Sequence, residues 1–190
     1  MSYVASDNVL GGQMAARALA AAIKETGKVY VASLKPGVST LDQREEGFRS
    51  EIAKYPGIEV LETQYNDQDP NKAAAQFQAV LGREPELAGV FGANLFSAVG
   101  AANGAEQAGV AGKVKIAGFD APESVVADLK SGTLEMTVAQ HPAEIGYFGV
   151  MAAYAAVTGN PVPTAIGTGF TVMTGANIDD PEVKRYLYTE

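Results

Sequence analysis

The sequence predicts an α/β fold in which one parallel β-sheet lies between two layers of helices. Short apolar segments rich in β-branched residues alternate with longer helical patterns about five times along the chain. Glycine is abundant, with 21 residues in 190, as in tightly packed α/β domains with short turns. An alternation of this kind forms βαβ units, whose strands run parallel and whose helices cover both faces of the sheet.

The predicted strands and helices follow one another without a linker or an internal repeat. Strands are expected at 29–34, 58–63, 88–92, 114–119 and 136–139. Helices are expected at roughly 9–26, 41–54, 70–82, 95–109 and 122–130. Gly27 and Gly109 stand where the first and fourth helices should end, because glycine tolerates the left-handed conformation that follows a helix.

A further helix is predicted over 142–158, and apolar side chains surround it. One face carries Ile145, Phe148, Ala152 and Ala155, and the other faces carry Tyr147, Met151, Tyr154 and Val157. A helix that is apolar nearly all round is normally buried on more than one side. Gly159 and Pro161 end it.

Charge and residue types exclude several classes of function. The net charge of -8 argues against nucleic acid as a partner, because phosphates require a basic surface. There are no cysteines and only one histidine, His141, so no nucleophile–base pair supports an enzyme and we expect no catalytic residue. A lone histidine is more often structural. Neither a G-x-G-x-x-G nor a Walker sequence is present, and we expect no cofactor and no metal.

The chain is not expected to enter a membrane or to carry its own export signal. It has no apolar run of about 18 residues. Residues 1–8 lack the basic and apolar regions of a signal peptide. If the protein is exported, we expect the signal to lie outside this chain.

Polar residues follow each predicted strand, at the edge of an open parallel sheet where ligands bind. They are Asp42, Gln43 and Arg44; Asn66, Asp67, Gln68 and Asp69; Asn94; Asp120; and Gln140 with His141. Carboxylates only accept hydrogen bonds, arginine only donates, and carboxamides do both. This mixture suits a neutral polyhydroxy ligand, whose hydroxyl groups donate and accept.

Structural roles explain the same residues equally well at this stage. Helix capping accounts for Asp7 or Asn8, for Asn94, and for Asp120 with Glu123 as a capping box. Arg44 lies in a charged stretch that is typical of a solvated surface, and Gln140 can be ordinary loop polarity.

Five short motifs occur in a fixed order along nearly the whole chain. They are A-S-D-N at 5–8, R-x-x-G-F at 44–48, G-A-N at 92–94, G-F-D at 118–120 and T-x-A-Q-x-P at 137–142. Together they resemble the ribose-binding type of sugar-binding protein from bacterial ABC importers. The resemblance implies a type I periplasmic-binding-protein-like lobe with the three-layer architecture predicted above.

The resemblance also implies a sugar site. In that family the matching residues hydrogen-bond the bound monosaccharide, which assigns Asn8, Arg44, Asn94, Asp120 and Gln140 to the ligand. Gln68 stands where ribose binders place an aromatic ring, so it is a further candidate contact and points away from ribose. Leu95 follows Asn94 where the family usually has Asp, which changes the local cap.

By resemblance, the function is to bind a monosaccharide or sugar alcohol as the solute-binding component of an ABC carbohydrate transporter. The partner is then an ABC permease, and the location of the parent protein is the periplasm. The alternative is the ligand-sensing domain of a lac-repressor-type regulator, for which a helix-turn-helix before Met1 would decide. The negative net charge and the A-S-D-N and A-Q-H-P motifs favour a transport protein over a regulator.

The same comparison divides the chain into three parts. Residues 1–140 are expected to form the C-terminal sugar-binding lobe with its leading segment, and 141–174 to belong to an otherwise missing N-terminal lobe. Residues 175–190 form a tail helix, capped by Asp179 or Asp180 with Pro181 in its first turn. Without the other lobe, we expect the chain to bind sugar weakly and to bury helix 142–158 in a homodimer.

Overall fold

The computed structural model describes residues 2–188 of the chain. Its strands are β1 (Tyr3–Ser6), β2 (Gly27–Ser33), β3 (Ile58–Val60), β4 (Gln64–Tyr65), β5 (Leu87–Gly92), β6 (Lys115–Phe119), β7 (Met136–Gln140), β8 (Ala165–Thr168) and β9 (Phe170–Thr174). Its helices are α1 (Asn8–Ala22), α2 (Ser39–Ile52), α3 (Pro70–Arg83), α4 (Leu95–Gln107), α5 (Val126–Ser131), α6 (Pro142–Val157) and α7 (Pro181–Lys184), and a 3-10 turn, η1 (Glu123–Val125), precedes α5.

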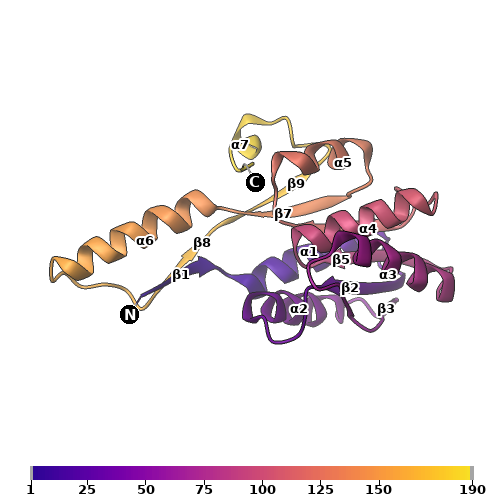
Figure 1. The fold of residues 1–190 in the computed structure, drawn as a ribbon, viewed down its shortest axis with the longest axis horizontal. Helices are drawn as coiled ribbons and strands as arrows, with labels where there is room; N and C mark the ends of the chain where they lie inside the picture. The colour runs from indigo at the N-terminus through magenta and orange to yellow at the C-terminus, as the bar shows by residue number, and fades with distance from the viewer. Residues whose placement is uncertain (1, 189–190) are drawn as a thin grey trace.

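The main body is a three-layer α/β unit, as predicted. Its sheet has the order β3-β2-β5-β6-β7-β9, with β4 also paired to β2. The pairs from β3 to β7 are parallel, and β9 runs antiparallel to β7 at one edge. Helices α1 and α2 cover one face of the sheet, and α3, α4 and α5 cover the other (Figure 1).

The central strands are buried on both sides, which explains their continuous apolar sequences. Along β2, Val29 and Val31 enter the core under α1 and α2, while Tyr30 enters the core under α3 and α4. Successive side chains of a strand point to opposite faces, so one strand contributes to both cores.

An extension projects from the main body at one end (Figure 1). Strand β1 pairs in parallel with β8, from Tyr3 beside Ala165 to Ser6 beside Thr168, and forms a separate two-stranded sheet. Helix α6 contacts both strands. None of its residues is buried, although its sequence is apolar on nearly every side. We call β1, α6 and β8 the extension.

Three details differ from the sequence prediction. Tyr3–Ser6 is a strand that the sequence analysis did not predict. The strand expected at 58–63 ends at Val60, and β4 follows it as a separate strand that pairs with a different part of β2. The segment 141–174 was expected to lie wholly outside the main body. Its last part, Phe170–Thr174, instead returns to the main sheet and pairs with β7.

The tail helix is capped where the sequence predicts, but it spans only Pro181–Lys184 and not the expected range 175–190. Asp180 caps α7, its side chain accepting a hydrogen bond from the Glu182 N–H at 2.9 Å, and Pro181 occupies the first turn. The last two residues of the expected range 175–190 lie outside the described residues. Within residues 2–188, no helix combines the length and the apolar character needed to span a bilayer.

Candidate functional site

Arg44 is a buried cation at the edge of the sheet rather than a surface residue. Only 5% of it is exposed. Its Nε donates to Asn8 Oδ1 at 2.9 Å and its Nη1 donates to the Ala93 carbonyl at 2.8 Å. The guanidinium carbon lies 3.7 Å from the centre of the Phe119 ring. The solvated-surface interpretation of Arg44 is therefore wrong.

Close packing of α1 against α2 brings Arg44 and Asn8 together. A Cβ atom on Gly12 would lie 2.0 Å from the Arg44 carbonyl oxygen, and one on Gly47 would lie 2.0 Å from the Val9 carbonyl oxygen. Only glycine allows two helix backbones to approach this closely. The G-F part of the R-x-x-G-F motif therefore has a packing role beside the arginine.

The charge of Arg44 is not neutralised by an ion pair within residues 2–188. Burial lowers the pKa of Arg44, and the negative charge of Asp120 opposes that shift. A guanidinium has five N–H donors, and the bonds to Asn8 and Ala93 use two of them. Buried charges are normally paired and fully hydrogen-bonded. Arg44 thus keeps donors for a partner that is not part of the described chain.

Asp120 and Gln140 form the second half of the candidate site. The Gln140 Nε2 donates to Asp120 Oδ1 at 2.7 Å. The Asp120 N–H donates to the Val138 carbonyl at 3.0 Å, and its own carbonyl accepts from Thr137 Oγ1 at 2.7 Å. The capping interpretation of Asp120 is wrong, because η1 has Pro122 at its cap position and no side-chain cap bond. Both side chains are half-buried, so they remain open to a ligand.

Asn8 and Asn94 differ in their relation to the helices that follow them. Asp7, not Asn8, caps α1, its Oδ1 accepting from the Leu10 N–H at 3.0 Å. Asn8 is 3% exposed, holds Arg44 and donates from Nδ2 to the Ser6 carbonyl at 3.1 Å. Asn94 does cap α4, its Oδ1 accepting from the Ser97 N–H at 2.9 Å, so its amide NH2 is the part that can meet a ligand.

Gln68 follows β4, which pairs with the carboxyl end of β2. It lies on an exposed loop with a positive φ of 66°, and its N–H donates to Asn66 Oδ1 at 3.1 Å. In the described chain, no hydrogen bond or ion pair joins its side chain to the other candidate residues. The structure places Asn8, Arg44, Asn94, Asp120 and Gln140 at one edge of the sheet, and Gln68 stays a predicted contact that none of these side-chain hydrogen bonds includes.

A hollow of about 350 Å³ opens beside the Asp120–Gln140 pair. Leu95, Phe96 and Tyr188 line it together with the start of α6. These three residues are not among the contacts predicted from the sequence. Leu95 and Phe96 directly follow Asn94, a proximity that could have indicated them, whereas no signal in the sequence places Tyr188 near Asp120.

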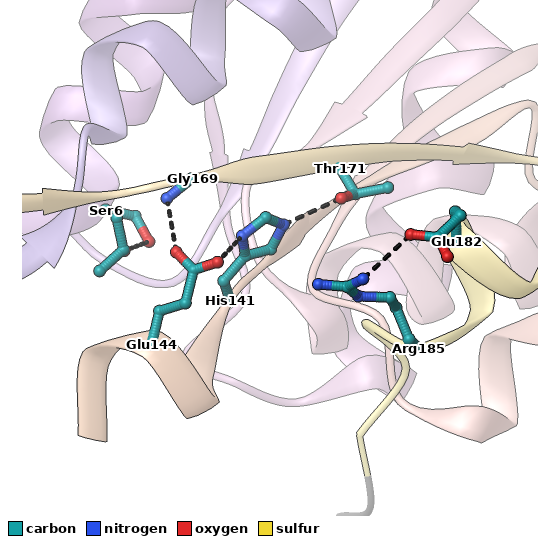
Figure 2. A network of polar contacts seen from close by, with 8 residues as sticks. Ser6, His141, Glu144, Gly169, Thr171, Glu182 and Arg185 are labelled. Carbon is teal, nitrogen blue, oxygen red and sulfur yellow. Dashed lines mark hydrogen bonds and ion pairs between the residues drawn. The ribbon is translucent and has the colours of Figure 1, made fainter. Parts of the chain in front are cut away.

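A second polar network joins the extension to the main body (Figure 2). His141 Nδ1 lies 2.9 Å from Glu144 Oε1 of α6, and Nε2 lies 2.9 Å from Thr171 Oγ1 of β9. Glu144 Oε2 accepts from the Gly169 N–H at 3.2 Å. The imidazole is 7% exposed and stacks on the Tyr186 ring with centroids 3.7 Å apart. His141 is thus structural, as expected of the lone histidine.

A sequence profile described as "Periplasmic binding protein domain" matches residues 1–161, which is most of the chain. The chain belongs to this family. A solved structure of similar fold is the ABC transporter solute binding protein of Agrobacterium vitis bound with α-D-tagatopyranose, which is 64% identical with a TM-score of 0.98. A second protein from the same organism, solved with bound D-fucose, is 34% identical with a TM-score of 0.93 and is matched over 98% of this chain and 64% of its own length.

Curated relatives of this periplasmic binding protein domain include ribose import binding proteins. That of Salmonella typhimurium is 35% identical over 162 residues, which are 85% of this chain and 54% of the relative. The tagatose-bound structure is matched over 100% of this chain and 63% of its own. The chain therefore spans about half to two thirds of the length of the proteins it resembles. Its three-layer body is one lobe of the type I periplasmic binding protein fold.

Proposed function

We propose that this periplasmic binding protein domain binds a monosaccharide or sugar alcohol as part of the solute-binding component of an ABC carbohydrate importer. The observation that carries the proposal is Arg44, a buried cation with unused donors that faces a half-buried carboxylate, Asp120. A combination of hydrogen-bond donors and acceptors at one edge of the sheet suits a neutral molecule with several hydroxyl groups. The sugars bound by the similar proteins are of this kind.

The proposed contacts are the residues at the carboxyl edge of the sheet. They are Asn8, Arg44, Asn94, Asp120 and Gln140, with Gln68 as a further candidate. Gln68 is a carboxamide and not an aromatic, so we propose that hydrogen bonding replaces stacking at this position and that ribose is not the preferred ligand. A competition assay in which ribose wins by about tenfold or more would count against this.

The proposed partners and location follow from the relatives. The similar proteins are import binding proteins and solute-binding proteins of ABC transporters. This similarity supports an ABC permease as the partner and the periplasm as the location. It also favours a transport function over that of a lac-repressor-type regulator. The proposed function contains no chemical step, so the domain is not proposed to be an enzyme. We propose further that the extension belongs to a second lobe, and that the main body with β9 and the tail forms the first.

Titration calorimetry of the complete protein with D-tagatose, D-fucose and D-ribose tests the function. We expect Arg44→Ala and Asp120→Ala each to weaken binding by about 2–4 kcal/mol, because a charged hydrogen bond is lost and its partner stays unpaired. Arg83→Gln, on the exposed end of α3, is the matched control and should bind as the wild type does. An Arg44 or Asp120 variant within twofold of wild type would contradict the site assignment.

The isolated chain offers a second test of the same proposal. It contains one side of the site, so we expect millimolar sugar binding or none, because enclosure provides much of the affinity of such sites. Binding as tight as that of the complete protein would contradict the proposed division into two lobes.

A further inference from the structure

The C-terminal tail crosses the candidate site after leaving the main sheet at β9. Ile178 is 1% exposed and packs in the core, and α7 follows. Beyond α7, two tyrosines attach the tail at separate points. Tyr186 stacks on His141, and Tyr188 forms a β-bridge with Pro122, its N–H donating to the Ala121 carbonyl at 3.3 Å.

The side chain of Tyr188 completes the hydrogen bonding of the loop that carries Asp120. Its hydroxyl oxygen accepts from the Ala121 N–H at 2.8 Å. Burial, and to a smaller extent the charge of Asp120, raise the pKa of Tyr188. The hydroxyl therefore keeps its proton, which it can donate toward Asp120 or toward a ligand.

Asp120 needs this support because its backbone is strained. Its φ is 73°, in the left-handed region that residues other than glycine rarely adopt. Such a conformation persists only where the surroundings fix it on several sides. Val138 and Thr137 hold the N–H and the carbonyl of Asp120, and the Tyr188 hydroxyl holds the next N–H along the chain.

Tyr188 also lines two hollows. One is the hollow of about 350 Å³ beside Asp120 and Gln140. The other, of about 520 Å³, is mostly apolar and reaches Val99 and Pro122. Leu95, Phe96 and Tyr188 line both. Removal of the ring would take away part of the wall that both hollows share.

We propose that Tyr188 is a positioning and specificity-determining residue of the sugar site. Its hydroxyl fixes the Asp120 loop in the binding geometry, and its ring limits the site to an unsubstituted monosaccharide. This inference rests on the proposed function, because the geometry that Tyr188 fixes matters only if Asp120 meets a sugar.

Two substitutions separate the roles of the hydroxyl and the ring. Tyr188→Phe removes the hydroxyl, which accepts from the Ala121 N–H and can donate toward Asp120, and Tyr188→Ala also removes the ring. Lys184→Ala, exposed on the same tail, is the control. Amide hydrogen exchange at Ala121 is measured in this chain, and D-tagatose affinity is measured by calorimetry in the complete protein, with melting temperatures to confirm that each variant folds.

We expect Y188F to accelerate exchange at Ala121 and to weaken D-tagatose binding by about tenfold, the effect of one lost hydrogen bond. Y188A should weaken binding further, and K184A should change neither readout by more than about twofold. Unchanged exchange in Y188F, or Y188F and Y188A affinities within twofold of wild type, would overturn the inference. If instead wild type binds none of D-tagatose, D-fucose and D-ribose while Y188F still accelerates exchange at Ala121, the proposed function fails, and the role of Tyr188 in binding fails with it.

Discussion

In the main body, α1 and α2 lie so close that a Cβ atom on Gly12 or Gly47 would overlap a backbone oxygen of the other helix. In the extension, Gly146 of α6 has no atom of another segment within 4 Å of the same position. The first region buries its apolar side chains in two cores, whereas α6 buries none and leaves Val157 83% exposed. Apolar side chains are therefore covered in the main body, whereas those of α6 are left exposed.

The difference indicates that the main body holds its own structure and that the extension presents a surface for another protein surface to cover. Exposed apolar patches of this kind mark interaction sites. The site residues follow the same division, because Asn8, Arg44, Asn94, Asp120 and Gln140 all belong to the body or to the point where the extension leaves it. The proposed ligand contacts are thus carried by the body and not by the exposed helix.

The largest expected effect is a substitution at the α1–α2 contact. Gly47→Ala should lower the free energy of unfolding by about 3 kcal/mol, because the new methyl group meets backbone that cannot move aside easily. Gly146→Ala on α6 is the matched change in the extension, and it should be neutral or stabilising by up to about 1 kcal/mol, as expected for a helix interior. Urea unfolding of both variants measures the difference. Equal effects would show that the two regions are packed alike.

The next prediction concerns what covers α6 in the isolated chain. Burial of each large apolar side chain is worth about 1.5–3 kcal/mol, and Tyr147, Val150 and Tyr154 are more than half exposed. We therefore propose that two copies pack these helices together and form a homodimer. Light scattering at micromolar concentration should give twice the mass of one chain.

Two lysine substitutions test whether α6 forms the dimer contact. Val150→Lys places a charge in the proposed contact and should yield monomers, whereas Ala108→Lys, on the exposed end of α4, should leave the dimer intact. A monomeric wild type, with α6 amides in rapid exchange, would contradict the proposal.

The sequence predicted the layers of the main body because each strand and helix has a local signal. β-branched runs mark the strands, and the alternation of strand and helix fixes the parallel order. It did not predict the return of Phe170–Thr174 to the sheet. An edge strand with this composition can pair with any sheet, so its partner is decided by the path of the chain and not by its own residues.

The candidate site could be predicted only in part, for a similar reason. Local sequence placed Arg44 in a charged run, whereas tertiary contacts with α1, Ala93 and Phe119 bury it. The family motifs nevertheless selected five residues that the structure brings to one edge. Tyr188 was missed because it reaches Asp120 through β9 and the tail, a route with no local signature.

A smaller effect is expected where the two regions join. His141→Ala removes contacts to Glu144 of the extension and to Thr171 of the body, and it should lower the free energy of unfolding by about 1–3 kcal/mol. Exchange of the Gly169 amide should accelerate as well, because Glu144 loses the group that orients it (Figure 2). Glu182→Gln breaks a nearby surface ion pair with Arg185 and is expected to cost less than about 1 kcal/mol. If both variants are equally stable, the network does not join the regions.

The smallest expected effect is a pH dependence of the unfolding free energy, which arises from an ion pair in the main body. Glu51 of α2 accepts from Arg17 of α1 at 2.9 Å and from Lys54 at 2.7 Å, and these two cations lower its pKa to about 2. Glutamate in the unfolded chain has a pKa of about 4.3, so folding favours the ionised form. The stabilisation is complete above the unfolded pKa and is lost as the pH falls toward 2.

Unfolding free energies measured from pH 6 to pH 2 should therefore decline less steeply in Glu51→Gln than in wild type. Glu46→Gln, exposed on the same helix, should follow the wild-type curve. A Glu51→Gln curve parallel to that of wild type would show that this ion pair does not link α1 to α2 energetically.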